Sequence, residues 1–303
     1  MKSRIFKFSF FIFHFSFLLF AACGKDNTDV RLRIFTENMT NGNSAKVLVD
    51  PDNINGASWV SGERINLNGT AYPVAYDENS YYLNTGSDDI SGSLLAVYPA
   101  DPADPGNDVT VTMDGATGTV TIRSLCVDYR GGNGGHRILF PMAASNDKSD
   151  MRLLFNHLTA GMRLTLTDTC SAKDYTIGSV KIVTYGDNAY AGALEAVNGV
   201  SCNWAVQGPA VPGGMIGEEA YDVNMAYSSE MRFTLKDNGT AGKAIATGDS
   251  ISLCVPVTVN RIKTLIVTGY DTDGQQLFTR TKTLDDELTV QRNTMYTIPE
   301  IKF

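Results

Sequence analysis

Residues 251–259 (ISLCVPVTV) and 263–278 (KTLIVTGYDTDGQQLF) decide the fold class of this chain. Apolar side chains recur at about every second position in both stretches, which is the period of a strand with one buried face. The second stretch is interrupted by Asp271, Thr272, Asp273 and Gly274, residue types that favour a tight turn. The pattern predicts a strand followed by a β-hairpin.

The same pattern continues toward both ends of the chain, and helical periodicity is nearly absent. Further strands are expected at 30–35 (VRLRIF), 93–98 (SLLAVY), 153–166 (LLFNHLTAGMRLTL) and 175–183 (YTIGSVKIV), and hairpins at 72–82 around 77–80 and at 109–122 around Asp114 and Gly115. The continuous apolar run at 93–98 is typical of a central strand buried on both faces. Strands spaced by about ten residues, with turn signals between them, predict an all-β sandwich or a pair of sandwiches.

A polar stretch at 145–150 (SNDKSD) is the expected boundary between two domains. It divides the chain into an N-terminal β-sandwich over 30–147 and a C-terminal β-sandwich over 148–303. Each part has a normal size for a sandwich domain.

The first 22 residues have the organisation of a signal peptide. Lys2, Arg4 and Lys7 precede an apolar run over 8–20, which is shorter than the ~20 residues of a membrane-spanning helix. Two alanines then precede Cys23, an arrangement similar to a bacterial lipobox, in which the cysteine is acylated. The alternative is an ordinary cleavage site beside a cysteine. Residues 23–29 are expected to form a lipidated tether.

Charge excludes one class of partner. Removal of residues 1–22 takes away three positive charges and no acidic residue, so the formal net charge changes from −8 to −11. An acidic chain of this kind is a poor ligand for nucleic acid, and anionic lipid headgroups repel it. Attachment to a membrane would therefore depend on acyl chains.

No residue pattern predicts a catalytic, cofactor or metal site. The acids at 271 and 273 are followed by no glutamate at the twelfth position of a calcium loop, and the glycine-rich loop at 131–135 lacks the lysine of a P-loop. His136 and His157 are the remaining histidines, and His157, beside Phe155 in an apolar strand, is expected to be a core or edge histidine. The acidic run 285–287 is expected to be a solvated face. The chain is therefore not expected to be an enzyme.

Four cysteines follow Cys23 and are widely spaced: Cys126, Cys170, Cys202 and Cys254. The exported compartment permits disulfides, but a domain with an ample core does not require them. Buried free thiols are the preferred interpretation. Trp59 and Trp204 are the two tryptophans, so an exposed aromatic platform for sugars is not evident.

Four stretches together resemble the fimbrillin-like lipoproteins of Bacteroidetes. They are 59–67 (WVSGERINL), 96–99 (AVYP), 154–164 (LFNHLTAGMRL) and 293–303 (NTMYTIPEIKF), in the order found in that family. The resemblance implies two transthyretin-like β-sandwich domains in tandem and a subunit of type V fimbriae. It also implies a palmitoylated, surface-exposed lipoprotein of the cell outer membrane and of the fimbrium, without a cofactor.

The resemblance further implies assembly by strand exchange with other fimbrial subunits. A protease removes the lipidated segment and the first strand, and a strand of the neighbouring subunit enters the vacated groove. In this chain the strand that would leave consists of Val30, Arg31, Leu32, Arg33, Ile34 and Phe35. Pairing of an added strand with open backbone groups would hold the subunits together.

Two features of the sequence differ from the family pattern. Lys46 is the only basic residue over 36–58 and is the candidate processing site, because cleavage after Arg33 or Arg64 would cut within an expected strand. No donor segment is expected after the last strand, which favours the tip of a fimbria or an accessory position. A membrane-retained anchor, or a monomeric surface lipoprotein that binds a glycan or a host protein, is the alternative.

Overall fold

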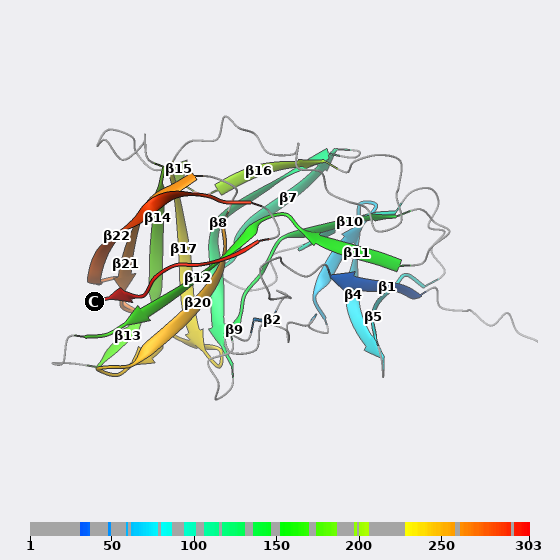
Figure 1. Ribbon diagram of the computed structural model, residues 1–303. Coiled ribbons are helices and arrows are strands. Elements are labelled where there is room, and N and C mark those ends of the chain that lie inside the picture. Colours follow the sequence, from blue (N-terminus) through cyan, green and yellow to red (C-terminus); the bar gives the residue numbers. More distant parts are fainter. Residues whose placement is uncertain are drawn as a thin grey trace, which may run out of the picture.

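The strands of this protein form a closed barrel and a set of sheets beside it (Figure 1). The structure is a computed structural model, and it describes residues 31–36, 48–49, 59, 62–77, 80–86, 94–100, 106–114, 117–130, 136–146, 152–169, 174–186, 197–198, 200–205, 228–257, 261–291 and 294–303. Within these ranges every regular element is a β-strand, which confirms the predicted all-β class.

The barrel contains the N-terminal strand and lies at one end of the molecule (Figure 1). Its strands are β1 (Arg31–Thr36), β3 (Arg64–Leu67), β4 (Thr70–Asp77), β5 (Ser80–Asn84), β6 (Leu94–Tyr98), β10 (Met142–Asn146) and β11 (Arg152–His157). They close in the order β1, β11, β10, β6, β3, β4, β5. Closure leaves no free edge, so every strand of the barrel has a neighbour on both sides.

Two sheets face each other in the rest of the molecule. The smaller contains β12 (Ala160–Thr167), β20 (Ser250–Val257), β23 (Met295–Thr297) and β24 (Ile301–Lys302). The larger follows the order β2 (Leu48–Val49), β9 (His136–Arg137), β8 (Thr117–Tyr129), β17 (Ser228–Asp237), β14 (Ser179–Tyr185), β21 (Arg261–Tyr270), β22 (Gln276–Thr289). Met162 and Val257 of the smaller sheet line a common apolar space with Phe233 and Ile262 of the larger one.

Shorter strands extend these sheets. β7 (Asp108–Asp114) and β16 (Val200–Ala205) pair with β8, and β15 (Val197–Asn198) and β18 (Thr240–Ala241) pair with β17. β13 (Tyr175–Ile177) and β19 (Lys243–Ile245) form a separate two-stranded sheet.

The predicted hairpins are confirmed. β21 and β22 pair antiparallel across 271–275, where the Oδ1 of Asp271 accepts the backbone N–H groups of Asp273 and Gln275 at 2.9 and 2.8 Å. Gly274 has a φ of 82°, which suits glycine at a tight turn. The hairpins over 72–82 and 109–122 also form, in β4 with β5 and in β7 with β8.

The strand predicted at 175–183 is divided. Gly178 separates β13 from β14, and its N–H donates to the carbonyl of Tyr270 at 2.8 Å. A Cβ at this position would lie 2.5 Å from the backbone oxygen of Asp271. The close approach of the two backbones therefore requires glycine where the sequence pattern indicates a continuous strand.

Strand pairing crosses the predicted division between residues 147 and 148. β8, which precedes this point, runs parallel to β17 in the larger sheet, and β11, which follows it, is part of the barrel. Alternation of apolar residues identifies strands but not their partners, because any strand with a buried face fits several neighbours.

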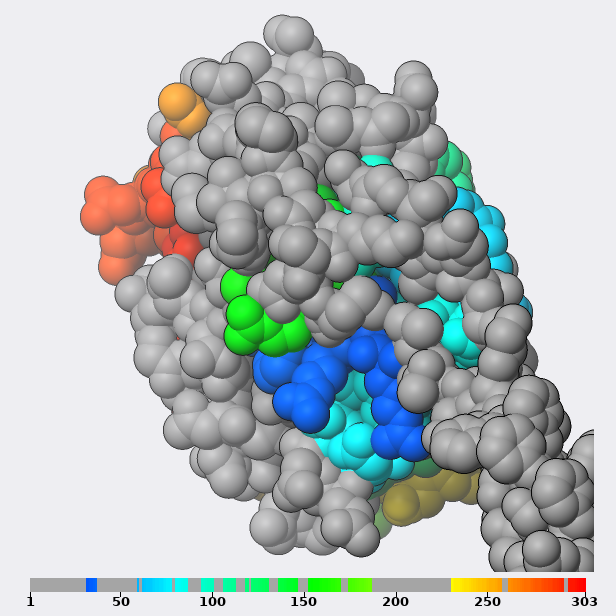
Figure 2. Space-filling model, turned by 90° about the vertical axis from the view of Figure 1, so that its right-hand side faces the viewer, coloured from blue at the N-terminus to red at the C-terminus, as the bar shows by residue number. Residues whose placement is uncertain are grey.

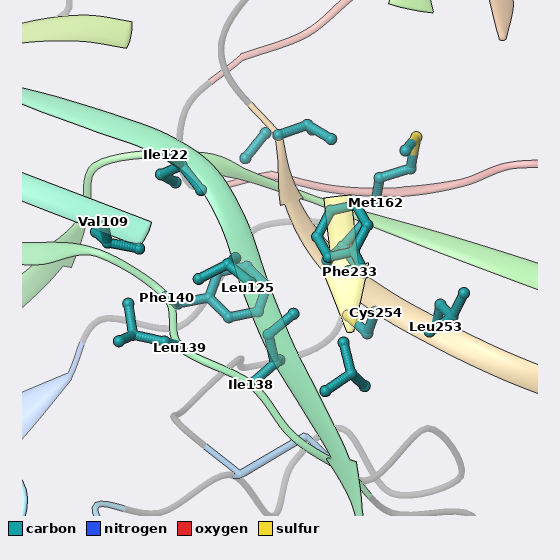
Figure 3. Packing of buried hydrophobic residues seen from close by; sticks show 14 of the residues in the cluster. Val109, Ile122, Leu125, Ile138, Leu139, Phe140, Met162, Phe233, Leu253 and Cys254 are labelled. Atoms are coloured by element: carbon teal, nitrogen blue, oxygen red, sulfur yellow. The ribbon is translucent and has the colours of Figure 1, made fainter. Parts of the chain in front are cut away.

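The buried apolar residues form one cluster that extends from Leu32 in the barrel to Phe303 in the smaller sheet. Figure 3 shows part of this cluster around β8, β12, β17 and β20.

Candidate functional site

β1 is held between β5 and β11 and completes the barrel. Arg31 to Arg33 lie antiparallel to β5, with Arg33 in register with Tyr82. Arg33 to Thr36 lie parallel to β11, with Thr36 in register with Phe155. The sequence predicts this strand but not its neighbours, and the structure identifies them as β5 and β11.

The inward face of β1 consists of two aliphatic side chains. Leu32 is 0% exposed and Ile34 is 3% exposed. Their register partners are Leu83 of β5 and Leu153 of β11, both fully buried. The predicted alternation of this strand is therefore confirmed, and removal of β1 would open the barrel core at these two positions.

The outward face of β1 is polar at one end and apolar at the other. Nη1 of Arg31 donates to Oδ2 of Asp77 at 3.3 Å, and the guanidinium carbon lies 4.8 Å from the ring centroid of Tyr82. Arg33 is exposed and in register with Arg152, which is also exposed. Phe35 is 44% exposed and is a large apolar side chain at the surface. Figure 2 shows this face of β1, in blue, beside the cyan of β4 and β5.

Three of the four resemblance motifs, 59–67, 96–99 and 154–164, meet close to this strand. Trp59 is buried, and its ring packs edge-on against Tyr98 and Phe155 at centroid distances of 5.1 and 5.2 Å. The carboxylate of Glu63 is 5% exposed and accepts from the hydroxyl of Tyr98 at 3.0 Å and from Nη2 of Arg137 at 3.2 Å. A buried carboxylate needs such partners, so these motif residues have a structural role in the barrel.

The arginine of this network could not be assigned from sequence. Glu63 lies in a quoted motif, whereas Arg137 follows a glycine-rich loop that carries no signal for a buried ion pair. Asp77 and Tyr82 belong to a predicted hairpin, but their contacts with Arg31 depend on the pairing of β1 with β5.

Several predicted N-terminal sites lie outside the described residues. These are Cys23, Val30 and Lys46, so acylation at Cys23 and processing at Lys46 stay predictions. The two other basic residues considered for processing are described. Arg33 is paired on both sides within β1, and Arg64 begins β3 and pairs with Pro73 of β4. A protease would have to detach either strand, because its active site requires an extended, unpaired substrate.

Both histidines contribute to the core. Nε2 of His136 accepts the backbone N–H of Cys254 at 3.1 Å, and its ring lies 5.4 Å from that of Tyr129. His157 is fully buried, as predicted, and its ring lies edge-on to Phe140 at 5.8 Å. Both rings are 0% exposed, which leaves no access for a substrate.

Two of the four later cysteines are described and are buried free thiols, as predicted: Cys126 and Cys254. Burial raises the pKa of the Cys254 thiol to about 12, and nearby Arg163 offsets part of this rise. The thiol is therefore protonated at neutral pH. Cys170 and the side chain of Cys202 lie outside the described part of the chain.

The predicted acidic face is a bulge within β22. Thr283 pairs with Thr264 and Leu288 pairs with Ile262, so residues 284–287 all lie opposite Lys263. Nζ of Lys263 donates to the carbonyl of Asp285 at 2.7 Å. Asp285 and Asp286 are exposed, in agreement with a solvated face.

In the described ranges no group of three or more His, Cys, Asp or Glu side chains is arranged to hold a metal ion. The same ranges contain no helix with the length and apolarity needed to span a membrane. The glycine-rich loop at 131–135 is outside them.

The final strands belong to the smaller sheet. β23 and β24 both run parallel to β12, and the N–H of Phe303 donates to the carbonyl of Thr167 at 2.9 Å. The ring of Phe303 stacks on Phe278 with a centroid distance of 3.9 Å. These residues therefore pair and pack within their own chain.

Comparison with known proteins gives structural neighbours only. No family model matches the chain, and no curated protein matches it. A candidate cell adhesion protein from Bacteroides ovatus is 12% identical with a TM-score of 0.44, over 92% of this chain and 93% of that one. Candidate cell adhesion proteins from Bacteroides uniformis (14%, TM-score 0.36, 90% and 95%) and Bacteroides thetaiotaomicron (10%, TM-score 0.32, 90% and 92%) are also similar.

Proposed function

We propose that this protein is a surface adhesion subunit of type V fimbriae, at the tip or in an accessory position, that accepts a strand of a neighbouring subunit in place of β1. The proposal includes export, acylation at Cys23 and attachment to the outer membrane. It assigns the protein a structural role and no catalytic one.

The observation that carries the proposal is the placement of β1. This strand directly follows the N-terminal segment in the sequence, pairs on both sides, and inserts Leu32 and Ile34 into the barrel core. Its loss would leave unpaired backbone on β5 and β11 and an open apolar seam, which together form the template for an added strand.

A protein cut between β1 and the rest of the barrel tests this proposal. A recognition sequence for a specific protease replaces residues 42–43, between Asn41 and Ser44, and the folded protein is cleaved there. We expect the cleaved protein to incorporate a fluorescent peptide of residues 30–36, whereas the uncleaved protein incorporates none. Absence of uptake by cleaved, folded protein would refute strand exchange.

Processing in the cell is tested separately at Lys46. Mass spectrometry of the mature N-terminus should find chains that begin at residue 47, and Lys46→Ala should convert them to chains that begin at acylated Cys23. Lys25→Ala is the matched control, because it removes a basic residue from the tether without touching the candidate site. Unchanged release from Lys46→Ala would exclude this site.

The second candidate is a membrane-retained fimbrial anchor, or a monomeric surface lipoprotein that binds a glycan or a host protein. The observation that favours it is the pairing of Arg33 and Arg64 within strands, which protects both from a protease. Both forms predict that every chain on the cell keeps acylated Cys23. The monomeric lipoprotein predicts in addition that no chain enters a higher-order species on a denaturing gel.

A further inference from the structure

We infer that the groove under β1 selects its donor strand by charge: a cation at the position of Arg31, aliphatic side chains at 32 and 34, and an acid at 33. This inference rests on the proposed strand exchange and specifies the partner, which is a strand of a neighbouring subunit with that pattern. The contacts that β1 makes in the closed barrel indicate these preferences.

The cation preference arises at one rim of the groove, from Asp77 of β4 and Tyr82 of β5. Asp77 accepts from Arg31 at 3.3 Å, and the ring of Tyr82 lies 4.8 Å from the Arg31 guanidinium carbon. Both groups belong to the part of the barrel that stays when β1 leaves. A donor strand in the same register would place its own side chain between the carboxylate and the ring face, an environment that favours a cation.

The acid preference arises at the next outward position. Arg33 of β1 and Arg152 of β11 lie in register on neighbouring parallel strands, and both side chains are exposed. Like charges directly opposite each other on a sheet are unfavourable, whereas opposite charges are favourable. A strand with an acid here would bring opposite charges into register with each other, so we expect the groove to prefer it over the arginine of β1.

The aliphatic positions fix the register between these two charges. Leu32 and Ile34 are in register with Leu83 and Leu153, which are both fully buried. A shift by one residue would bring charged side chains into the core, so the donor can enter only with its apolar residues at 32 and 34. The two charged positions are then presented to Asp77 and Arg152.

Competition between peptides tests the inference on the full chain carrying the cleavable linker described above. The reference peptide has residues 30–36, and the two competitors carry Arg31→Gln and Arg33→Glu. We expect the Arg31→Gln peptide to be taken up about 3- to 30-fold less well than the reference, from an exposed ion pair and a cation–π contact together. The Arg33→Glu peptide should be taken up about 1.5- to 5-fold better.

Variants of the groove assign these preferences to the named residues. Asp77→Asn keeps Oδ1, which accepts from the backbone N–H of Ser80, and removes the charge. The double variant Asp77→Asn, Tyr82→Leu should take up the reference and Arg31→Gln peptides equally well. The single variant Tyr82→Phe retains the ring and should still prefer the reference peptide. The discrimination should also fall in about 1 M salt, where screening acts within ~3 Å.

The outcomes separate this inference from the proposed function. Equal uptake of all three peptides would overturn the charge preference and leave strand exchange intact. Discrimination at position 31 that persists in the Asp77→Asn, Tyr82→Leu variant would also overturn it. No uptake of any peptide would overturn strand exchange and the inference together.

Discussion

Truncation of Leu32 to alanine tests the contribution of β1 to the barrel. The side chain is 0% exposed and faces Leu83 across the register with β5. Replacement of a fully enclosed leucine by alanine costs about 2–5 kcal/mol, and the closed barrel restricts collapse around the cavity, so we expect ~3 kcal/mol. Phe35→Ala, on the outward face at 44% exposure, is the matched control and should cost less than about 1 kcal/mol.

Urea unfolding followed by tryptophan fluorescence measures this difference. Trp59 reports on the barrel, because it packs against Phe155, the register partner of Thr36 at the end of β1. With an m value of about 3 kcal/mol per M, a loss of ~3 kcal/mol moves the midpoint by about 1 M. Equal midpoints for Leu32→Ala and Phe35→Ala would refute the assignment of β1 to the barrel core.

Three further predictions concern buried and titrating groups. In a double-mutant cycle, Glu63→Gln and Tyr98→Phe should show a coupling of about 1–2 kcal/mol, because their hydrogen bond is buried and charged, and additive losses would argue against it. The thiol of Cys254, with its pKa raised to about 12 and no exposed surface, should react with a thiol reagent only after unfolding, and rapid labelling of the native protein would contradict this. Glu300, whose pKa is lowered by the hydrogen bond from Thr167 and then by Lys302, should stabilise the fold above its ordinary pKa of 4.5 and lose this effect as the pH falls through the lowered value. Urea midpoints of Glu300→Gln and the unaltered protein should therefore differ at neutral pH and converge in acid.

The sequence predicts the strands well because the signal for a half-buried strand is local. Alternation at 30–35 places Leu32 and Ile34 on one face, and both are buried. The apolar run at 93–98 is a central strand between β10 and β3. Turn residues locate the hairpins, since glycine and aspartate meet a local backbone requirement there.

Pairing between distant strands is not local, and the sequence does not determine it. The parallel pairing of β1 with β11 and of β8 with β17 brings together segments separated by more than a hundred residues. These pairs decide where the sheets divide, and the antiparallel pairing of β1 with β5, also between distant segments, decides which residues face Arg31. The rim formed by Asp77 and Tyr82 therefore becomes visible only when the barrel closes.

The depth of β1 in the barrel bears on how exchange would proceed. Burial of an aliphatic side chain such as Leu32 or Ile34 contributes roughly 1.5–3 kcal/mol, so the release of both costs at least ~3 kcal/mol before any backbone pairing is counted. At 1.4 kcal/mol for each factor of ten, the groove is vacant in less than about 1% of molecules. A donor that waits for a vacant groove would therefore react slowly.

Stepwise displacement avoids this cost, because a donor that pairs with β5 or β11 residue by residue exposes one aliphatic position at a time. The register of β1 with β5 ends at Arg33 and Tyr82, whereas β5 begins two residues earlier, at Ser80. This end offers a donor its first contacts. We expect the exchange rate in cleaved protein to rise in proportion to the concentration of the donor peptide and to exceed the release rate of labelled β1 measured by dilution. A rate that is independent of donor concentration would show instead that β1 must leave before a new strand can enter.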